Sequence, residues 1–177
     1  MCDFQRDPPT LPPLAEDEYV VDSPRVRRLI ADVRELIGQA DSPERSCELI
    51  GPLFAGLLAD RDWLPAPYQA LAAKSGMGGG IGQWLVFRAA DRSLSLFSLV
   101  VPPGAITPVH DHLAWGLVGI YRGNQDEEFY VQCPAGGLTS CAGARWILAT
   151  STRCCRRETT SIESGRRHTR HPYRSTC

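Results

Sequence analysis

Two histidines, His110 and His112, carry the clearest chemical signal in this 177-residue chain. They lie two residues apart in an apolar stretch. In an extended strand, residues at that spacing point to the same face, while Asp111 between them points to the other face. Two neutral imidazoles on one face can bind a single transition-metal ion. A solvent-exposed or hydrogen-bonded histidine pair is the alternative interpretation of the same pattern.

The residues around this pair resemble a known motif. Gly104 lies six residues before His110, and Gly123 ends the apolar segment that follows. This spacing resembles Gly-x5-His-x-His-x3-4-Glu-x6-Gly, the first motif of the cupin family, except that Gly116 stands at the glutamate position. A cupin motif without its glutamate is similar to that of the cysteine dioxygenase-type thiol dioxygenases. The resemblance covers residues 20 to 140 and is most specific between Gly104 and Gly123.

The resemblance implies a metal, a substrate and a reaction. His110 and His112 would bind a non-haem Fe(II) ion together with a third histidine. Arg88, on an expected strand, would bind the substrate carboxylate with its forked guanidinium; a solvent-facing strand arginine is the alternative. The implied reaction oxidises a small thiol, such as cysteine or 3-mercaptopropionate, to its sulfinate with O2. The catalytic residues that assist the thiol chemistry in the family have no counterpart that we can assign.

The third histidine of such a site is not identified in this sequence. His168 and His171 are the remaining histidines, and the arginines around them would repel a cation. Because two ligands alone hold a metal weakly, we expect this chain to bind iron poorly. Trp115 and Tyr130 are candidates for a pocket lining, although aromatic residues on barrel strands more often belong to the core.

The composition indicates one globular domain without an electrostatic signature for nucleic acid or membranes. The chain is 43% hydrophobic and 22% charged, with a formal net charge of −1, and neither a nucleic-acid partner nor a membrane partner is expected. We expect a cytoplasmic protein, because no apolar run is long enough to span a bilayer. The seven cysteines are odd in number and contain no Cys-x-x-Cys pair, which favours reduced thiols. The glycine run at 77–82 lacks the spacing of a nucleotide-binding loop.

Three regions follow from the patterning. Residues 1–22 are rich in proline and acidic residues and are expected to form an extended arm. Residues 23–136 are expected to form a single cupin-type domain, with two helices between 23 and 60 and a β-meander from 83 to 132. Each helix is predicted to start at a Ser-Pro pair, at Ser23 and at Ser42. The predicted fold class is mainly β: an incomplete cupin barrel (a double-stranded β-helix or jelly roll) preceded by two N-terminal α-helices.

The tail, residues 137–177, differs in kind from the rest of the chain. It contains eight arginines and two acidic residues, and no strand or helix periodicity is visible, so it is expected to be disordered or out of frame. The chain has one lysine and one asparagine, which indicates a GC-rich gene, and such genes read out of frame yield arginine, cysteine, serine and threonine. We therefore interpret the tail as the product of a frame slip near Thr139. A basic nucleic-acid-binding arm is the alternative.

A one-base shift of the tail permits a Pro-Gly-Asp turn followed by Pro-Pro-Gly-x-x-Ile-His, which resembles the second cupin motif with its histidine. The leading functional hypothesis is therefore a thiol dioxygenase impaired by loss of the third histidine. A non-catalytic cupin that binds a metal or a small ligand is the second hypothesis. An inactive truncated fragment is the third. The substrate thiol and the oligomeric state are left open.

Overall fold

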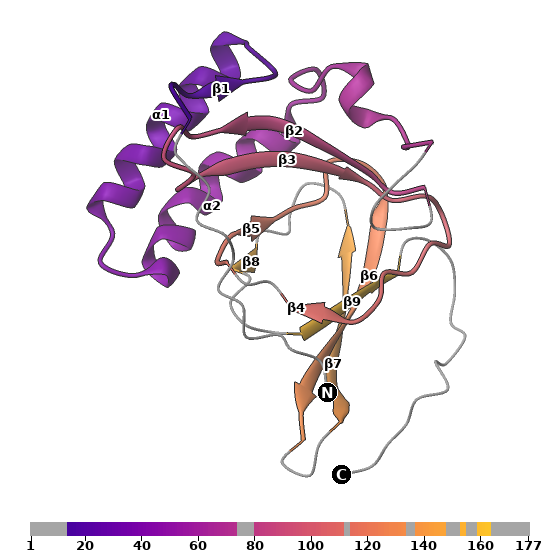
Figure 1. The fold of residues 1–177 in the computed structure, drawn as a ribbon. Helices are drawn as coiled ribbons and strands as arrows, with labels where there is room; N and C mark the ends of the chain where they lie inside the picture. Colours follow the sequence, from indigo (N-terminus) through magenta and orange to yellow (C-terminus); the bar gives the residue numbers. More distant parts are fainter. Residues whose placement is uncertain are drawn as a thin grey trace.

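A computed structural model describes residues 14–73, 80–111, 114–133, 137–147, 153–154 and 159–163. After a short first strand come two helices, and the other antiparallel strands follow them (Figure 1), in partial agreement with the predicted helices-then-strands order. The elements are β1 (Glu18–Tyr19), α1 (Pro24–Gln39), α2 (Pro43–Ala59), the 3-10 helix η1 (Ala66–Gln69), β2 (Gly82–Arg88), β3 (Ser95–Val100), β4 (His110–Asp111), β5 (Leu117–Val118), β6 (Asn124–Gln132), β7 (Leu138–Ile147), β8 (Arg153–Cys154) and β9 (Thr159–Glu163).

Both helices begin where the Ser-Pro pairs predict. The Ser23 hydroxyl accepts a hydrogen bond from the Val26 backbone N–H at 3.2 Å, and the Ser42 hydroxyl accepts one from the Arg45 N–H at 3.1 Å. A proline occupies the first helical position each time, where its missing N–H costs no intrahelical bond. The buried residues of α1 recur at helical spacing and form one apolar face: Val26, Leu29, Ile30 and Val33.

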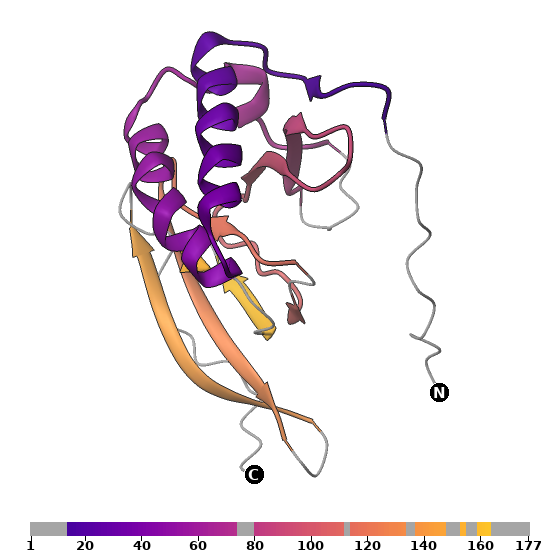
Figure 2. The same cartoon turned by 90° about the vertical axis from the view of Figure 1, so that its left-hand side faces the viewer.

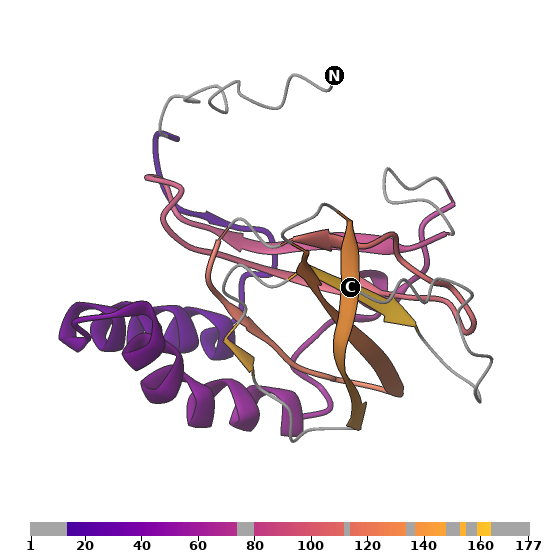
Figure 3. The same ribbon diagram turned by 90° about the horizontal axis from the view of Figure 1, so that it is seen from below.

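That apolar face packs against a three-stranded antiparallel sheet of order β1-β2-β3. Figures 2 and 3 show α1 and α2 side by side on one side of this sheet. The register of β2 against β3 shifts between Leu85 and Phe87, as at a β-bulge, and this interrupts the alternation of faces. Val86 and Phe87 are accordingly both fully buried, although they are consecutive.

The described part of the N-terminal arm, residues 14–22, is extended but packed. The Leu14 N–H donates to the Ala90 carbonyl at 2.8 Å, and Val21 is only 5% exposed. The Tyr19 ring lies 4.7 Å from the Phe87 ring, centroid to centroid. This segment is packed because it gains a strand partner, β2, that lies some 70 residues further along the chain.

The strands after β3 do not form the predicted meander. They build a four-stranded sheet of order β4-β9-β6-β7 and a separate β5-β8 pair. The strand that contains His110 pairs with β9, at His110↔Thr160, and β5 pairs with β8, at Leu117↔Cys154. β4, β5 and β6 thus do not pair with one another, and each pairs with a strand from the tail. The sheets are separate in the described residues, and a closed cupin barrel stays a prediction.

The tail contributes three of these strands, β7, β8 and β9, where the sequence analysis expected no secondary structure. β7 pairs with β6 from Asn124↔Ile147 to Gln132↔Leu138, and β9 lies between β4 and β6. Sheet ladders join backbone groups, so pairing does not require the alternating pattern whose absence suggested disorder. The frame-slip hypothesis concerns the gene and stays a prediction. Within the described ranges, neither helix has the length and apolarity needed to cross a membrane.

Candidate metal-binding and carboxylate-binding residues

His110 lies at the first position of β4 and is half-buried. Its Nδ1 lies 2.8 Å from the carbonyl oxygen of Pro108. A carbonyl oxygen only accepts hydrogen bonds, so Nδ1 carries the proton and, in the neutral ring, Nε2 carries the lone pair. Metal-binding histidines commonly donate their second nitrogen to such a group, which fixes the tautomer and the orientation of the ring. His110 therefore fits the role of a metal ligand through Nε2.

The two glycines that bound the motif both have a left-handed backbone. Gly104 has φ +78° and Gly123 has φ +81°. A Cβ added at either position would meet nothing within 4 Å, so the backbone angle and not the available space favours glycine at these positions. Glycine at both ends of the His110 segment thus has a local structural reason.

The rest of the predicted ligand set cannot be placed. His112, the second predicted ligand, lies outside the described residues, as do the two remaining histidines, His168 and His171. In the part of the chain that the structure describes, no three His, Cys, Asp or Glu side chains are grouped so that they could hold a metal ion. Of the predicted ligands, the described structure thus places His110 alone.

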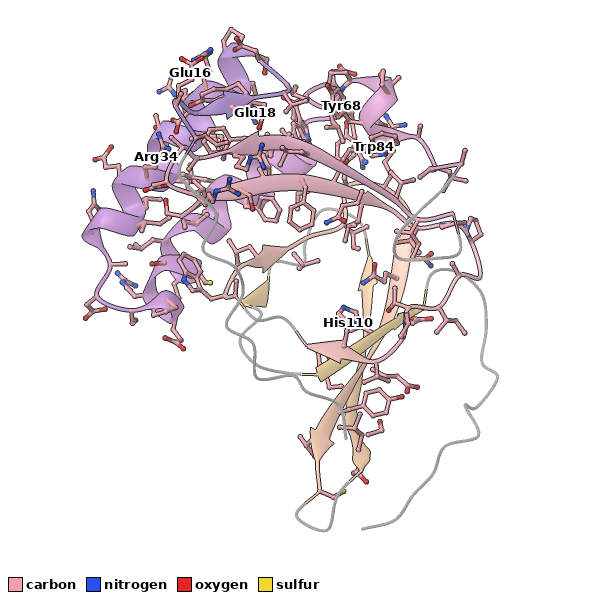
Figure 4. All side chains as sticks on the ribbon, viewed as in Figure 1. Glu16, Glu18, Arg34, Tyr68, Trp84 and His110 are labelled. Atoms are coloured by element: carbon pink, nitrogen blue, oxygen red, sulfur yellow. The ribbon has the colours of Figure 1, made fainter. Side chains whose placement is uncertain are left out.

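Arg88, the predicted carboxylate-binding residue, ends β2 and already contacts a carboxylate. Its Nε and Nη2 donate to the same oxygen, Oε2 of Glu18, at 3.1 and 2.5 Å. The two side chains are 36% and 43% exposed. Figure 4 shows Glu18 on the first sheet, beside the helices, and His110 well apart from it on β4. The structure does not bring Arg88 and His110 together.

For the aromatic candidates Trp115 and Tyr130 the sequence analysis favoured positions in the core, but neither residue is buried. Trp115 is 37% exposed. Tyr130 is half-buried, and its hydroxyl donates to Glu128 Oε2 at 2.7 Å. A hollow of about 500 Å³ lies between α2 and β5, where Glu44, Cys47 and Glu48 contribute to its lining. Of the predicted site residues that the structure describes, none lines it.

The sequence analysis did not predict the ionic cluster that joins the N-terminal segment to α1. Arg34 binds Asp17 with two hydrogen bonds of 2.6 and 2.9 Å, and the Ala90 N–H donates a third at 2.9 Å. These bonds, those from Arg34 first, lower the pKa of Asp17 from 3.8 to about 2. Arg27 likewise lowers the pKa of Asp22. The available signal was an acidic run at 16–18 beside a helix with several arginines.

The expectation that all cysteines are reduced is wrong for Cys133, which is disulfide-bonded. It is 7% exposed, and its N–H donates to the Gly137 carbonyl at 3.0 Å at the turn between β6 and β7. Cys47 is reduced and buried, as expected. Sequence spacing cannot reveal which cysteines pair, because pairing depends on the folded positions of the sulfur atoms.

Comparison with known protein families assigns no role to any of these residues. Arg88 and His110 are therefore described by their own contacts, which are the Glu18 carboxylate and the Pro108 carbonyl. No protein-family model matches the chain.

Proposed function

We propose that the chain is a non-haem iron thiol dioxygenase of the cysteine dioxygenase type, impaired by the loss of its third histidine. The observation that supports this proposal is the hydrogen bond from His110 Nδ1 to Pro108, within a segment bounded by two left-handed glycines. The bond presents Nε2 as the metal-binding nitrogen. The reaction would convert a small thiol, such as cysteine or 3-mercaptopropionate, to its sulfinate with O2 in a cupin barrel.

In this proposal each residue has a defined role. His110 and His112 would bind Fe(II), which supplies the one-electron chemistry needed to activate O2. Arg88 would bind the substrate carboxylate, because a guanidinium can bind both carboxylate oxygens at once. Two ligands hold a metal weakly, so we expect poor iron retention and low turnover.

A non-catalytic module that binds a small carboxylate is the second candidate. It is favoured by the position of Arg88, which contacts Glu18 and lies apart from His110. Such a module would bind a ligand at Arg88 without a metal. An inactive truncated fragment is the third candidate and would do neither.

Thiol-dependent O2 uptake separates the three candidates. The full chain, loaded anaerobically with Fe(II), is mixed with cysteine or 3-mercaptopropionate and O2, and the sulfinate is measured by mass spectrometry. We expect slow sulfinate formation that His110→Ala abolishes and that His171→Ala, the matched control outside the motif, leaves unchanged. Ligand binding without sulfinate would support the binding module, and neither binding nor sulfinate would support the fragment.

Sequencing the gene across codons 135–165 tests the origin of the tail. We expect a shifted frame that encodes the Pro-Pro-Gly-x-x-Ile-His segment and restores a third histidine. If neither alternative frame encodes that histidine, the frame-slip hypothesis is wrong. Restoring the frame should raise both the iron content and the O2 uptake of the purified protein.

A further inference from the structure

The hydrogen bonds between Arg88 and Glu18 do not use the strongest geometry that a guanidinium offers a carboxylate. Both hydrogen bonds from the guanidinium end on one oxygen, Oε2 of Glu18. A carboxylate that approaches in the plane of the guanidinium can instead accept two parallel bonds, one on each oxygen, which is the stronger arrangement. A small carboxylate ligand could therefore gain from Arg88 a geometry that Glu18 does not use.

The same contact is accessible from solvent. The Arg88 side chain is 36% exposed and the Glu18 side chain 43% exposed, so a small anion can approach the pair. Ion pairs at this degree of exposure are weak, because water screens the attraction and each side chain loses conformational freedom. Exchange of Glu18 for another carboxylate is therefore energetically feasible.

The segment that carries Glu18 is held in place by bonds that do not involve its carboxylate. The Val20 and Val21 N–H groups donate to the Val86 carbonyl at 3.0 and 3.1 Å. On the other side of Glu18, the Asp17 carboxylate binds Arg34 and the Ala90 N–H. The Glu18 side chain can thus rotate away from Arg88 while the backbone of β1 stays paired with β2.

We propose that Glu18 is an internal competitor that controls the access of small carboxylate ligands to Arg88. This inference rests on the proposed role of Arg88 in binding the substrate carboxylate. A ligand that binds Arg88 must displace Glu18, so its measured affinity is reduced by the fraction of molecules in which Glu18 occupies the site. Removing the Glu18 charge therefore increases the affinity.

The test measures binding of 3-mercaptopropionate to the full, metal-free chain under anaerobic conditions. Chemical shifts of the arginine Nε–Hε groups in ¹⁵N-labelled protein report the occupancy of Arg88, which the Arg88→Gln spectrum assigns. We expect Glu18→Gln to lower the Kd about two- to five-fold. Glu16→Gln makes the same charge change at an exposed neighbour and should leave the Kd unchanged. Arg88→Gln should abolish saturable binding.

Three results would overturn the inference: an unchanged Kd in Glu18→Gln, an equal change in Glu16→Gln, or no saturable binding in either Glu18→Gln or wild type. Glu18→Ala provides a second variant, and circular dichroism checks that each variant is folded. Because the assay uses neither iron nor O2, a failure of thiol oxidation does not alter its outcome. If binding survives Arg88→Gln, the carboxylate role of Arg88 in the proposed function also fails.

Discussion

Asp17 connects three parts of the molecule through one carboxylate. It belongs to the N-terminal segment, accepts two hydrogen bonds from Arg34 on α1, and accepts a third from the Ala90 N–H after β2. These donors favour the ionised form and lower the pKa of Asp17 to about 2. A carboxyl group with a depressed pKa in the folded state stabilises the fold above its unfolded-state pKa. That stabilisation is lost as the pH falls through the folded-state pKa.

The Asp17 carboxylate should therefore make stability depend on pH between about 4 and about 2. We expect Asp17→Asn to lower the free energy of unfolding at pH 6, and the gap to wild type to close as the pH falls across that window. Urea denaturation at a series of pH values measures the gap. Glu16→Gln, the neighbouring control, should produce a smaller gap at pH 6. A gap for Asp17→Asn that stays constant down to pH 2 would contradict this assignment.

Comparing Gly104 with Gly38 tests how much a left-handed backbone at a glycine matters for stability. A Cβ would meet nothing within 4 Å at either position, but Gly104 has φ +78° while Gly38 lies in α1. We expect Gly104→Ala to destabilise the protein by about 1–2 kcal/mol. Gly38→Ala should stabilise it by up to about 1 kcal/mol. Thermal unfolding of the two variants tests the signs, and the same sign for both would rule out this explanation.

At the scale of elements, β2 joins the helices to the sheet through one face. Phe87 is fully buried, its ring lies 4.7 Å from the tilted Tyr19 ring, and the Arg34 guanidinium lies over it at 5.5 Å. Phe97 on β3 is 46% exposed. One phenylalanine thus lies in the core and the other at the surface, so comparing Phe87 with Phe97 separates the effect of burial from that of residue type.

Phe87→Ala should destabilise the fold by about 3–5 kcal/mol, because it removes a large buried side chain and leaves a cavity. Phe97→Ala should change the stability by less than about 1 kcal/mol. Equilibrium denaturation with urea measures both values. Equal losses in the two variants would mean that the face of β2 that carries Phe87 does not form the core.

At the scale of the whole molecule, the second sheet depends on strands from the tail. β6 is paired on both sides, with β7 along its whole length and with β9 from Asp126 to Tyr130. We expect the amides of β6 and β7, like those of β2, to exchange with solvent slowly in hydrogen-exchange mass spectrometry. Exchange in Leu138–Ile147 at the rate of an unfolded chain would support the disordered tail that the sequence predicts.

The features that could be predicted from the sequence depend on near neighbours. The Ser23 and Ser42 hydroxyls accept hydrogen bonds from residues three positions ahead. The turn that joins β2 to β3 is also short, so the helix caps and this turn each depend on only a few neighbouring residues. The backbone angles of Gly104 and Gly123 are equally local. Of the candidate site, the position of His110 on a strand was predicted for the same reason.

The features that could not be predicted depend on partners distant in sequence. Glu18 and Arg88 are 70 residues apart, β9 inserts between β4 and β6, and Cys133 is disulfide-bonded. Nothing in the residues near Arg88 indicates which carboxylate it meets, because that choice is made when separate strands pair in register. Local sequence therefore sets the caps, turns and strand-forming segments, whereas the partners of Arg88 and His110 are settled by long-range backbone pairing in the folded chain.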